Sequence, residues 1–202
     1  MQIKVLQKAN SQDIDALSSI HYTELRGSLL SRFGKKFLRF LYDGICSDEG
    51  NIILVLRSGK QIVGFLIAAK NISQFYKNSI KKNLFSITCE MIFHAPGNVL
   101  LLLKMIGLLA EQKPNGIDAT EIQFFAILPQ FRRKGKGRKM LQMLKSLLTK
   151  ESIQYLKVGT KASNKLSNRF YLQNGFRFLY KKNILGDELN YYLLKTGIKT
   201  NK

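Results

Sequence analysis

The chain has 202 residues, of which 45% are hydrophobic and 23% are charged. This length and composition are typical of a folded chain with one core, and they exclude a disordered or low-complexity protein. The formal net charge of +20 favours a neutral or anionic partner, so nucleic acid, acidic lipid and phosphorylated small molecules all fit.

The two cysteines, Cys46 and Cys89, are too few for a disulfide framework and lack the spacing of a metal site, which is typical of a reducing compartment. The polar amino terminus lacks the apolar core of a signal peptide. The longest apolar stretch, residues 99–110, is interrupted by Lys104 and is shorter than the roughly 20 residues that a spanning helix needs. We therefore expect a cytoplasmic protein without a membrane span.

Alternating residues around Ile3 and Val5 predict a first strand, and Ser11 is the predicted cap of a helix that follows. A second helix is expected from Gly34. Its apolar positions recur every three or four residues and predict one wide buried face. These positions are Phe37, Leu38, Leu41, Tyr42 and Ile45.

Two apolar runs, 51–56 and 61–67, flank a short glycine turn and predict an antiparallel hairpin. Residues 72–118 are expected to be mainly helical, with a break at Pro96-Gly97 and a loop at 113–116.

Residues 121–128 form a predicted strand that runs into Pro129, followed by a helix over 136–149 and a strand over 155–160. Such a unit is a parallel strand–helix–strand crossover. A helix over 164–174, closed by Gly175, and a hairpin of strands over 176–182 and 188–194 complete the pattern.

The fold class is therefore mixed α/β, with a largely antiparallel central sheet that contains one parallel pair and is flanked by helices. We expect one domain over residues 1–196, with a helical insert at about 72–118 and a polar tail over 197–202.

A basic glycine loop, Arg132-Arg133-Lys134-Gly135-Lys136-Gly137-Arg138, lies between the strand at 121–128 and the next helix. Free backbone N–H groups at a helix start, together with five cations, favour an anion. The loop fits neither a Walker A sequence nor a dinucleotide fingerprint, since Met140 stands where the fingerprint needs its third glycine.

The run from Ile127 to Gly137 resembles the acetyl-CoA loop of the GNAT acetyltransferases, whose pattern is Arg/Gln-x-x-Gly-x-Gly/Ala. A second motif, Asn164-x-x-Ser167-x-x-Phe170-Tyr171-x-x-x-Gly175-Phe176, is similar to the motif that follows in that family. The resemblance covers residues 120–182 by motif and residues 50–70 by topology. It implies a GNAT-like fold, with a splayed parallel strand pair, and an N-acetyltransferase that uses acetyl-CoA as co-substrate and no metal.

The resemblance also implies residue roles. The loop amides would bind the pyrophosphate, the preceding strand would pair with the pantetheine arm, and Asn164 would contact the arm or cap its helix. The implied acetyl-CoA-binding residues are Ala126, Ile127, Leu128, Arg132, Arg133, Lys134, Gly135, Lys136, Gly137, Arg138, Asn164 and Tyr171.

Acetyl transfer to an amine needs a base and a proton for the departing thiolate. Tyr171 is the candidate acid, because a phenol with a pKa near 10 stays protonated at neutral pH; the alternative is a tyrosine that only packs. Glu121 is the candidate base, as in similar strands of some GNAT enzymes, or else a surface carboxylate paired with a lysine. Alternation predicts that Glu121 shares a strand face with Gln123, Phe125 and Ile127.

The sequence leaves three possible classes of function. The amino-terminal third is similar to GNAT proteins of surface-polysaccharide pathways, which suggests a small-molecule amine such as a nucleotide-linked amino sugar. A protein lysine or amino terminus is the second class, and a basic module for nucleic acid or a membrane surface is the third, although no RNA-binding signature accompanies the lysines. His21 and His94 are possible pocket residues, and the apolar 100–109 segment could face the core or a second subunit in a homodimer.

Overall fold

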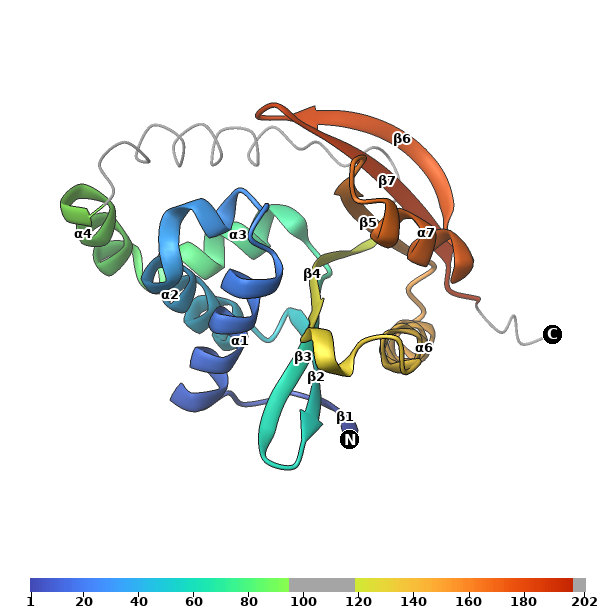
Figure 1. The fold of residues 1–202 in the computed structure, drawn as a ribbon, viewed down its shortest axis with the longest axis horizontal. Coiled ribbons are helices and arrows are strands. Elements are labelled where there is room, and N and C mark those ends of the chain that lie inside the picture. Colours follow the sequence, from blue (N-terminus) through green and yellow to red (C-terminus); the bar gives the residue numbers. More distant parts are fainter. Residues whose placement is uncertain (95–118, 198–202) are drawn as a thin grey trace.

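One sheet organises the protein. The computed structural model describes residues 1–94 and 119–197. The strands are β1 (Gln2–Val5), β2 (Asn51–Ser58), β3 (Gln61–Ala69), β4 (Thr120–Ile127), β5 (Tyr155–Lys161), β6 (Arg177–Ile184) and β7 (Asp187–Lys195). They form a seven-stranded sheet in the order β1-β2-β3-β4-β5-β7-β6 (Figure 1).

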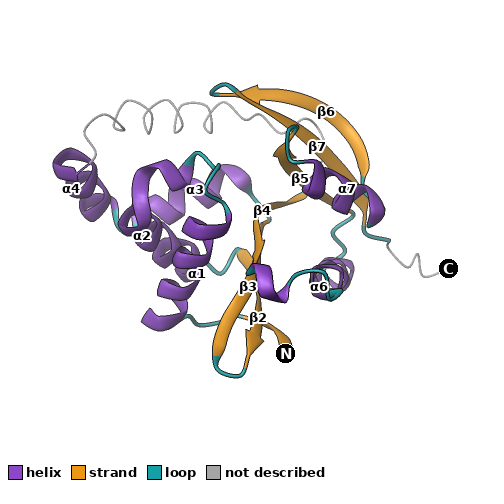
Figure 2. Ribbon diagram, in the orientation of Figure 1, coloured by secondary structure: helices purple, strands orange, loops and turns teal. Residues whose placement is uncertain are grey.

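Helices cover both faces of this sheet. They are α1 (Ser11–Glu24), α2 (Gly34–Ser47), α3 (Ile72–Lys81), α4 (Leu84–His94), α6 (Lys136–Lys150) and α7 (Lys165–Gln173), with short 3-10 helices η1 (Leu30–Phe33) and η3 (Pro129–Phe131). Figure 2 shows α1 to α4 on one side of the strands and α6 and α7 on the other. None of the described helices is long and apolar enough to cross a membrane.

The two amino-terminal helices form as their sequence predicts, with one difference at the first cap. The side chain of Asn10 accepts from the N–H of Asp13 at 2.9 Å, and the Asp13 carboxylate accepts from the N–H of Asn10. Asn10 is therefore the cap and Ser11 is the first helical residue, since the capping box needs its acidic residue three positions after the cap. The predicted face of α2 is confirmed, and its five apolar side chains are fully buried.

The central hairpin is also confirmed, because β2 and β3 pair antiparallel and close at Ser58 opposite Gln61. The helices α3 and α4 confirm the first half of the predicted helical region. The predicted break at Pro96-Gly97, the loop at 113–116 and the apolar 100–109 segment lie outside the described residues.

The parallel crossover is confirmed by the pairing of β4 with β5 on either side of α6. The carboxy-terminal hairpin is confirmed too, but its second strand, β7, lies between β5 and β6. Gly175 follows α7 with a φ of 86°, the left-handed conformation expected of the residue after a helix.

Strand β4 contributes to both hydrophobic cores. Phe124 and Ala126 belong to the cluster that packs against α1 and α2. Ile122 belongs to the cluster that packs against α6 and α7, and Phe125 and Ile127 lie at its edge. The same strand therefore reaches both faces of the sheet.

Candidate functional site

The sheet forks between β4 and β5. These strands pair only from Thr120 opposite Leu156 to Ile122 opposite Val158. Beyond that point β4 stays paired with β3 as far as Ile127, and β5 stays paired with β7 as far as Lys161. Among the described strands, neither has a ladder partner on its inner edge past the fork, so part of the backbone there is open to a ligand.

The glycine loop leads from β4 into α6 and has two left-handed residues, Arg133 with a φ of 56° and Gly135 with a φ of 69°. A Cβ on Gly135 would meet no atom within 4 Å, so its backbone conformation accounts for a glycine there. A Cβ on Gly137 would lie 3.3 Å from the Phe170 ring and 3.5 Å from the Phe125 ring. Gly137 therefore allows the first turn of α6 to approach both aromatic side chains.

The start of α6 is built to hold an anion. Gly135 is the residue before the helix and provides no side-chain cap, which leaves the first amides of α6 without an intrahelical acceptor. Arg133, Lys134, Lys136 and Arg138 form no ion pair with any described residue. Free amides, the helix dipole and these cations together suit a phosphate group.

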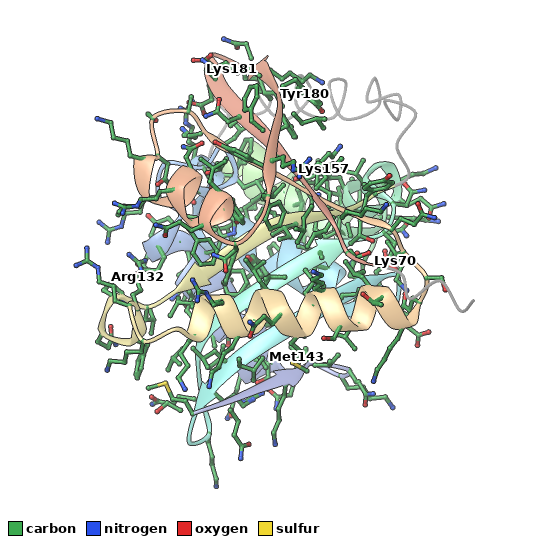
Figure 3. The ribbon with its side chains drawn as sticks, turned by 90° about the vertical axis from the view of Figure 1, so that its right-hand side faces the viewer. Lys70, Arg132, Met143, Lys157, Tyr180 and Lys181 are labelled. Atoms are coloured by element: carbon green, nitrogen blue, oxygen red, sulfur yellow. The ribbon has the colours of Figure 1, made fainter. Side chains whose placement is uncertain are left out.

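Arg132 differs from its neighbours, because its guanidinium is held within the protein. Its Nε donates to the carbonyl of Ile127 at 2.6 Å, and its Nη2 pairs with the carboxylate of Glu24 at the end of α1. Figure 3 shows Arg132 at the end of α6 where the helix begins. Its side chain braces the loop against α1.

The backbone of β4 past the fork is only partly available. The N–H of Leu128 donates to the carbonyl of Val63 at 2.9 Å, and the carbonyl of Ile127 accepts from Arg132. Because alternate residues of an antiparallel strand direct their peptide groups to opposite edges, those of Phe125 and Ile127 face the fork. Those of Ala126 and Leu128 face β3.

Tyr171 lies in the core on the α6 and α7 side of the sheet. Its ring packs against Phe170, Phe176 and Tyr192, and its side chain is 6% exposed. Burial raises the pKa of Tyr171 well above its ordinary value, so the phenol stays protonated at neutral pH. The protonated phenol can donate a hydrogen bond.

Glu121 lies on the opposite side of the sheet, and a β-bulge decides which residues share its face. Phe124 pairs with Ile67 while Ile122 pairs with the adjacent Ala68, so Gln123 is the extra residue of β4. The predicted face is wrong for Phe125 and Ile127, which pack towards α6, because a bulge shifts the alternation by one residue.

Gln123 does share the face of Glu121, and a polar cluster forms around the two side chains. The hydroxyl of Tyr76 donates to Gln123 Oε1 at 3.0 Å. The ammonium of Lys157 lies 2.7 Å from Glu121 Oε2 and 5.6 Å from the centroid of the Tyr191 ring. Figure 3 shows Lys157 on the part of the sheet beyond α6, below Tyr180.

Glu121 is 6% exposed, so it is not a surface carboxylate, although it does pair with a lysine. Burial raises the pKa of Glu121 above its ordinary value, and the Lys157 ammonium opposes this rise. A carboxylate that burial makes more basic, placed beside the fork, suits proton abstraction.

Asn164 caps α7, as one of its two predicted roles requires. Its side chain accepts from the N–H of Ser167 at 3.1 Å. One turn later Asn168 links α7 to β7, since its side-chain oxygen accepts from Tyr192 at 2.6 Å and from Asn190 at 2.8 Å. These bonds fix α7, and with it Tyr171, against the sheet.

His21 lies in the core. Its side chain is fully buried, and its two ring nitrogens lie 2.9 Å from the hydroxyl of Tyr42 and 3.0 Å from that of Ser28. It holds the segment after α1 against α2. The side chain of His94 lies outside the described part of the chain.

A groove of about 790 Å³ lies along the β1–β2 edge, and no predicted site residue lines it. Within residues 1–94 and 119–197, no group of three or more histidine, cysteine or acidic side chains is placed to hold a metal ion.

Sequence reasoning missed four residues of the site, Glu24, Tyr76, Lys157 and Tyr191. None of the four belongs to a sequence motif, because tertiary packing brings each of them to the fork. Only Lys157 could have been found, since a parallel pairing of the two predicted strands places it beside Glu121.

The comparisons agree with this geometry. The sequence matches the Acetyltransferase (GNAT) family over residues 15–176. A search of curated proteins found no match.

Solved structures share the fold. The ribosomal-protein-S18-alanine N-acetyltransferase from Escherichia coli has a TM-score of 0.61 at 13% identity, covering 99% of this chain and 96% of that one. The PaiA N-acetyltransferase from Thermoplasma acidophilum, solved in complex with coenzyme A, has a TM-score of 0.57 at 13% identity, covering 95% and 98%. A protein from Desulfovibrio desulfuricans assigned to the GNAT family has a TM-score of 0.63 at 12% identity, covering 97% and 99%.

The TM-scores show a common fold, and the family match covers most of the sequence. The protein therefore belongs to the GNAT acetyltransferase family.

Proposed function

We propose that the protein transfers the acetyl group of acetyl-CoA to the primary amine of a small molecule, such as an amino sugar that can carry a nucleotide. Transfer is direct, within a complex of both substrates. The observation that carries this proposal is the fork between β4 and β5 with the glycine loop beside it.

The residues around the fork fit acetyl-CoA. The first amides of α6, together with Arg133, Lys134, Lys136 and Arg138, would hold its phosphates. The peptide groups of Phe125 and the N–H of Ile127 would pair with its pantetheine amides, since the Ile127 carbonyl already accepts from Arg132. Arg132 would support the loop indirectly, through Glu24 and the Ile127 carbonyl.

The bound donor supplies an acetyl group activated as a thioester. Glu121 would remove a proton from the acceptor ammonium, directly or through water, so that the neutral amine attacks the carbonyl carbon. The C–S bond then breaks, and Tyr171 would give its proton to the departing thiolate. The nitrogen loses its second ammonium proton to water, and solvent returns a proton to Tyr171. Base and acid lie on opposite faces of the sheet, which suits an acceptor and a donor that enter from opposite faces.

The choice of a small molecule rests on the resemblance of the amino-terminal third and on the charge of +20, which suits a phosphorylated acceptor. A protein lysine or amino terminus is the competing acceptor. Two of the similar structures are ribosomal-protein alanine N-acetyltransferases, with identities of 13% and 15%. Their TM-scores of 0.61 support the shared fold, and identities this low do not identify the acceptor of this protein.

Calorimetric titration with acetyl-CoA tests the donor site. Gly135→Asp would place a carboxylate beside the phosphates, and we expect its affinity to fall by about 100-fold or more, as for an unpaired like charge. Because Gly135 has a φ of 69°, any side chain there causes strain. Gly135→Asn is the matched control, since asparagine has the same size, tolerates this conformation and is neutral.

Weak loss in Gly135→Asn and near-complete loss in Gly135→Asp would support a phosphate at this loop. If the folded native protein does not bind acetyl-CoA, the proposed function is wrong.

A further inference from the structure

Basic residues are concentrated in the part of the chain that contains the glycine loop and α7. Residues 122–186 include 15 lysines and arginines but a single acidic residue, Glu151. Five of the cations belong to the glycine loop. On α7, Lys165 and Arg169 are exposed and form no ion pair with a residue that the structure describes. These two cations are therefore available to an anionic partner.

Helix α7 carries the two cations on the same face as two exposed leucines. With 3.6 residues per turn, about one third of the helix circumference contains Lys165 and Arg169. The same third contains Leu166 and Leu172, whose side chains are 73% and 51% exposed. Tyr171 lies on the opposite, buried face of the helix. The exposed face is therefore distinct from the side of α7 that the proposed acetyl-CoA site uses.

Phe178 extends this exposed face onto the sheet. Its side chain is 53% exposed, and its ring lies edge-on to Tyr192 with 6.0 Å between the centroids. The Tyr192 hydroxyl donates to Asn168 of α7, so Phe178 lies on the sheet face that α7 covers. Leu172 follows Asn168 by one turn and shares its flank of the helix. Figure 1 shows α7 beside β6 and β7. The α7 surface thus consists of Lys165, Leu166, Arg169, Leu172 and Phe178.

The composition of the α7 surface favours a lipid bilayer as its partner. Three of the eight large apolar side chains that are exposed in the described chain lie on this surface. At a bilayer, apolar side chains enter the boundary between headgroups and acyl chains, while lysine and arginine bind anionic headgroups. A nucleic acid would use the cations but leave the leucines exposed, because contacts to its backbone are polar. A second copy of the chain would bring like charges together.

We propose that the α7 surface docks the protein on an anionic lipid bilayer. Leu166, Leu172 and Phe178 insert below the headgroups. Lys165 and Arg169 bind the anionic groups of the lipids. Because the proposed acetyl-CoA site lies on the buried side of α7, acetyl-CoA and lipid bind together. The inference goes beyond the proposed acetyl transfer and does not depend on it.

Co-sedimentation of the whole protein with lipid vesicles tests the proposal. One kind of vesicle contains phosphatidylcholine alone, and the other contains phosphatidylcholine and phosphatidylserine in a ratio of about 3:1. We expect the native protein to bind the anionic vesicles about ten-fold more strongly or better, because each cation near the surface is attracted to them. The difference should shrink as the salt concentration rises.

A first double variant removes apolar side chains and keeps the charge. It combines Leu166→Gln with Leu172→Gln, and glutamine is a good helix former, so we expect α7 to persist. The matched control combines Leu84→Gln with Phe85→Gln, which changes two exposed apolar side chains of α4. We expect the α7 variant to lose about ten-fold or more in affinity for the anionic vesicles, and the control to stay within about two-fold of native.

A second double variant removes charge and keeps the apolar side chains. It combines Lys165→Gln with Arg169→Gln. The matched control, Lys77→Gln with Lys81→Gln, removes the same charge from exposed positions of α3. We again expect a loss of about ten-fold or more in the α7 variant and about two-fold or less in the control. Circular dichroism verifies that all four variants are folded.

A parallel series with saturating acetyl-CoA separates the α7 surface from the glycine loop, where lipid headgroups could also bind. Vesicle binding that persists supports the α7 surface. Binding that acetyl-CoA abolishes assigns the lipid to the loop and overturns the inference. Equal binding to both kinds of vesicle, no binding to either, or equal losses in the matched controls also overturn it.

Single-stranded poly(U) RNA is the probe for the competing partner. We expect the Leu166→Gln, Leu172→Gln variant to bind poly(U) as the native protein does, since a leucine adds nothing to polar backbone contacts. If the native protein binds poly(U) but no vesicle, and only the variant without Lys165 and Arg169 loses that binding, the α7 surface serves a nucleic acid and the inference is wrong.

Discussion

Glu24, the last residue of α1, pairs with Arg132 in the glycine loop 108 residues later. Through the same guanidinium the loop is also tied to the Ile127 carbonyl at the end of β4. One side chain thus joins the helix on the proposed acceptor side to the loop on the proposed donor side. Arg132 therefore fixes the position of the loop in the protein without bound acetyl-CoA.

Glu24→Gln should weaken acetyl-CoA binding slightly. Arg132 is 46% exposed, and an ion pair of this kind contributes up to about 1 kcal/mol, which corresponds to roughly five-fold in affinity. Calorimetric titration measures the effect. Tighter binding in Glu24→Gln would contradict the bracing role, because it would mean that Glu24 competes with acetyl-CoA for Arg132.

The loop and the crossover could be predicted because their signals are local. Residues 132–138 and 164–176 carry motifs whose conformation depends on residues close to them in the sequence. Gly135 and Gly175 have the left-handed φ that these motifs require. The βαβ unit follows from a strand, a helix and a strand in sequence. Hence the fold and the loop were both accessible from the residues alone.

The acceptor side could be predicted only in part: alternation placed Gln123 on the face of Glu121, but the register shift in β4 left no signal in the sequence. Strict alternation places Phe125 and Ile127 with Glu121, whereas the bulge at Gln123 turns both towards α6. Tyr76 reaches Gln123 from α3, 47 residues away. The sequence pattern of neither segment predicts this contact, because it forms only when α3 packs on the sheet.

Lys157→Met should shift the acidic limb of the pH–rate profile. Burial already raises the pKa of Glu121, and the Lys157 ammonium opposes that rise, so its removal raises the pKa further. A base must be deprotonated to act, and activity should therefore disappear at a higher pH than in the native protein. The measurement is kcat/KM against pH.

The control for this variant is Lys70→Met. Lys70 also forms an ion pair, with Glu151 directly after α6, but it is not among the groups that shift the pKa of Glu121. Its profile should match that of the native protein. An unchanged limb in Lys157→Met would show that Glu121 is not the group whose titration limits the rate.

Tyr171→Phe should lower kcat by about 100-fold or more, as expected for loss of a general acid, and leave the affinity for acetyl-CoA nearly unchanged. The phenylalanine ring keeps the packing against Phe176 and Tyr192. Steady-state kinetics and calorimetry separate the two effects.

Tyr192→Phe is the matched control for the hydroxyl. Tyr192 is equally buried, but its hydroxyl donates to Asn168 at 2.6 Å and serves the fold. We expect it to lose stability by about 1 kcal/mol with kcat within a few-fold of native. Equal losses of kcat in both variants would make Tyr171 a packing residue.

The free energy of unfolding should fall as the pH drops below neutrality, because buried His21 resists protonation in the folded protein. Burial lowers the pKa of His21 from 6.5 to about 4, so the unfolded chain binds a proton more readily than the folded one. The stability from neutral His21 is complete above pH 6.5 and is lost as the pH falls from 6.5 through 4. Linkage gives a loss of about 2 kcal/mol between pH 7.5 and pH 5.

Urea unfolding at several pH values measures this loss. His21→Asn should be less stable than the native protein at pH 7.5, because it breaks the bonds to Tyr42 and Ser28. Its free energy of unfolding should nevertheless change less between pH 7.5 and pH 5, since the titrating ring is gone. Parallel curves for the two proteins over this range would show that another group controls the acid sensitivity, because the difference between them isolates the contribution of His21.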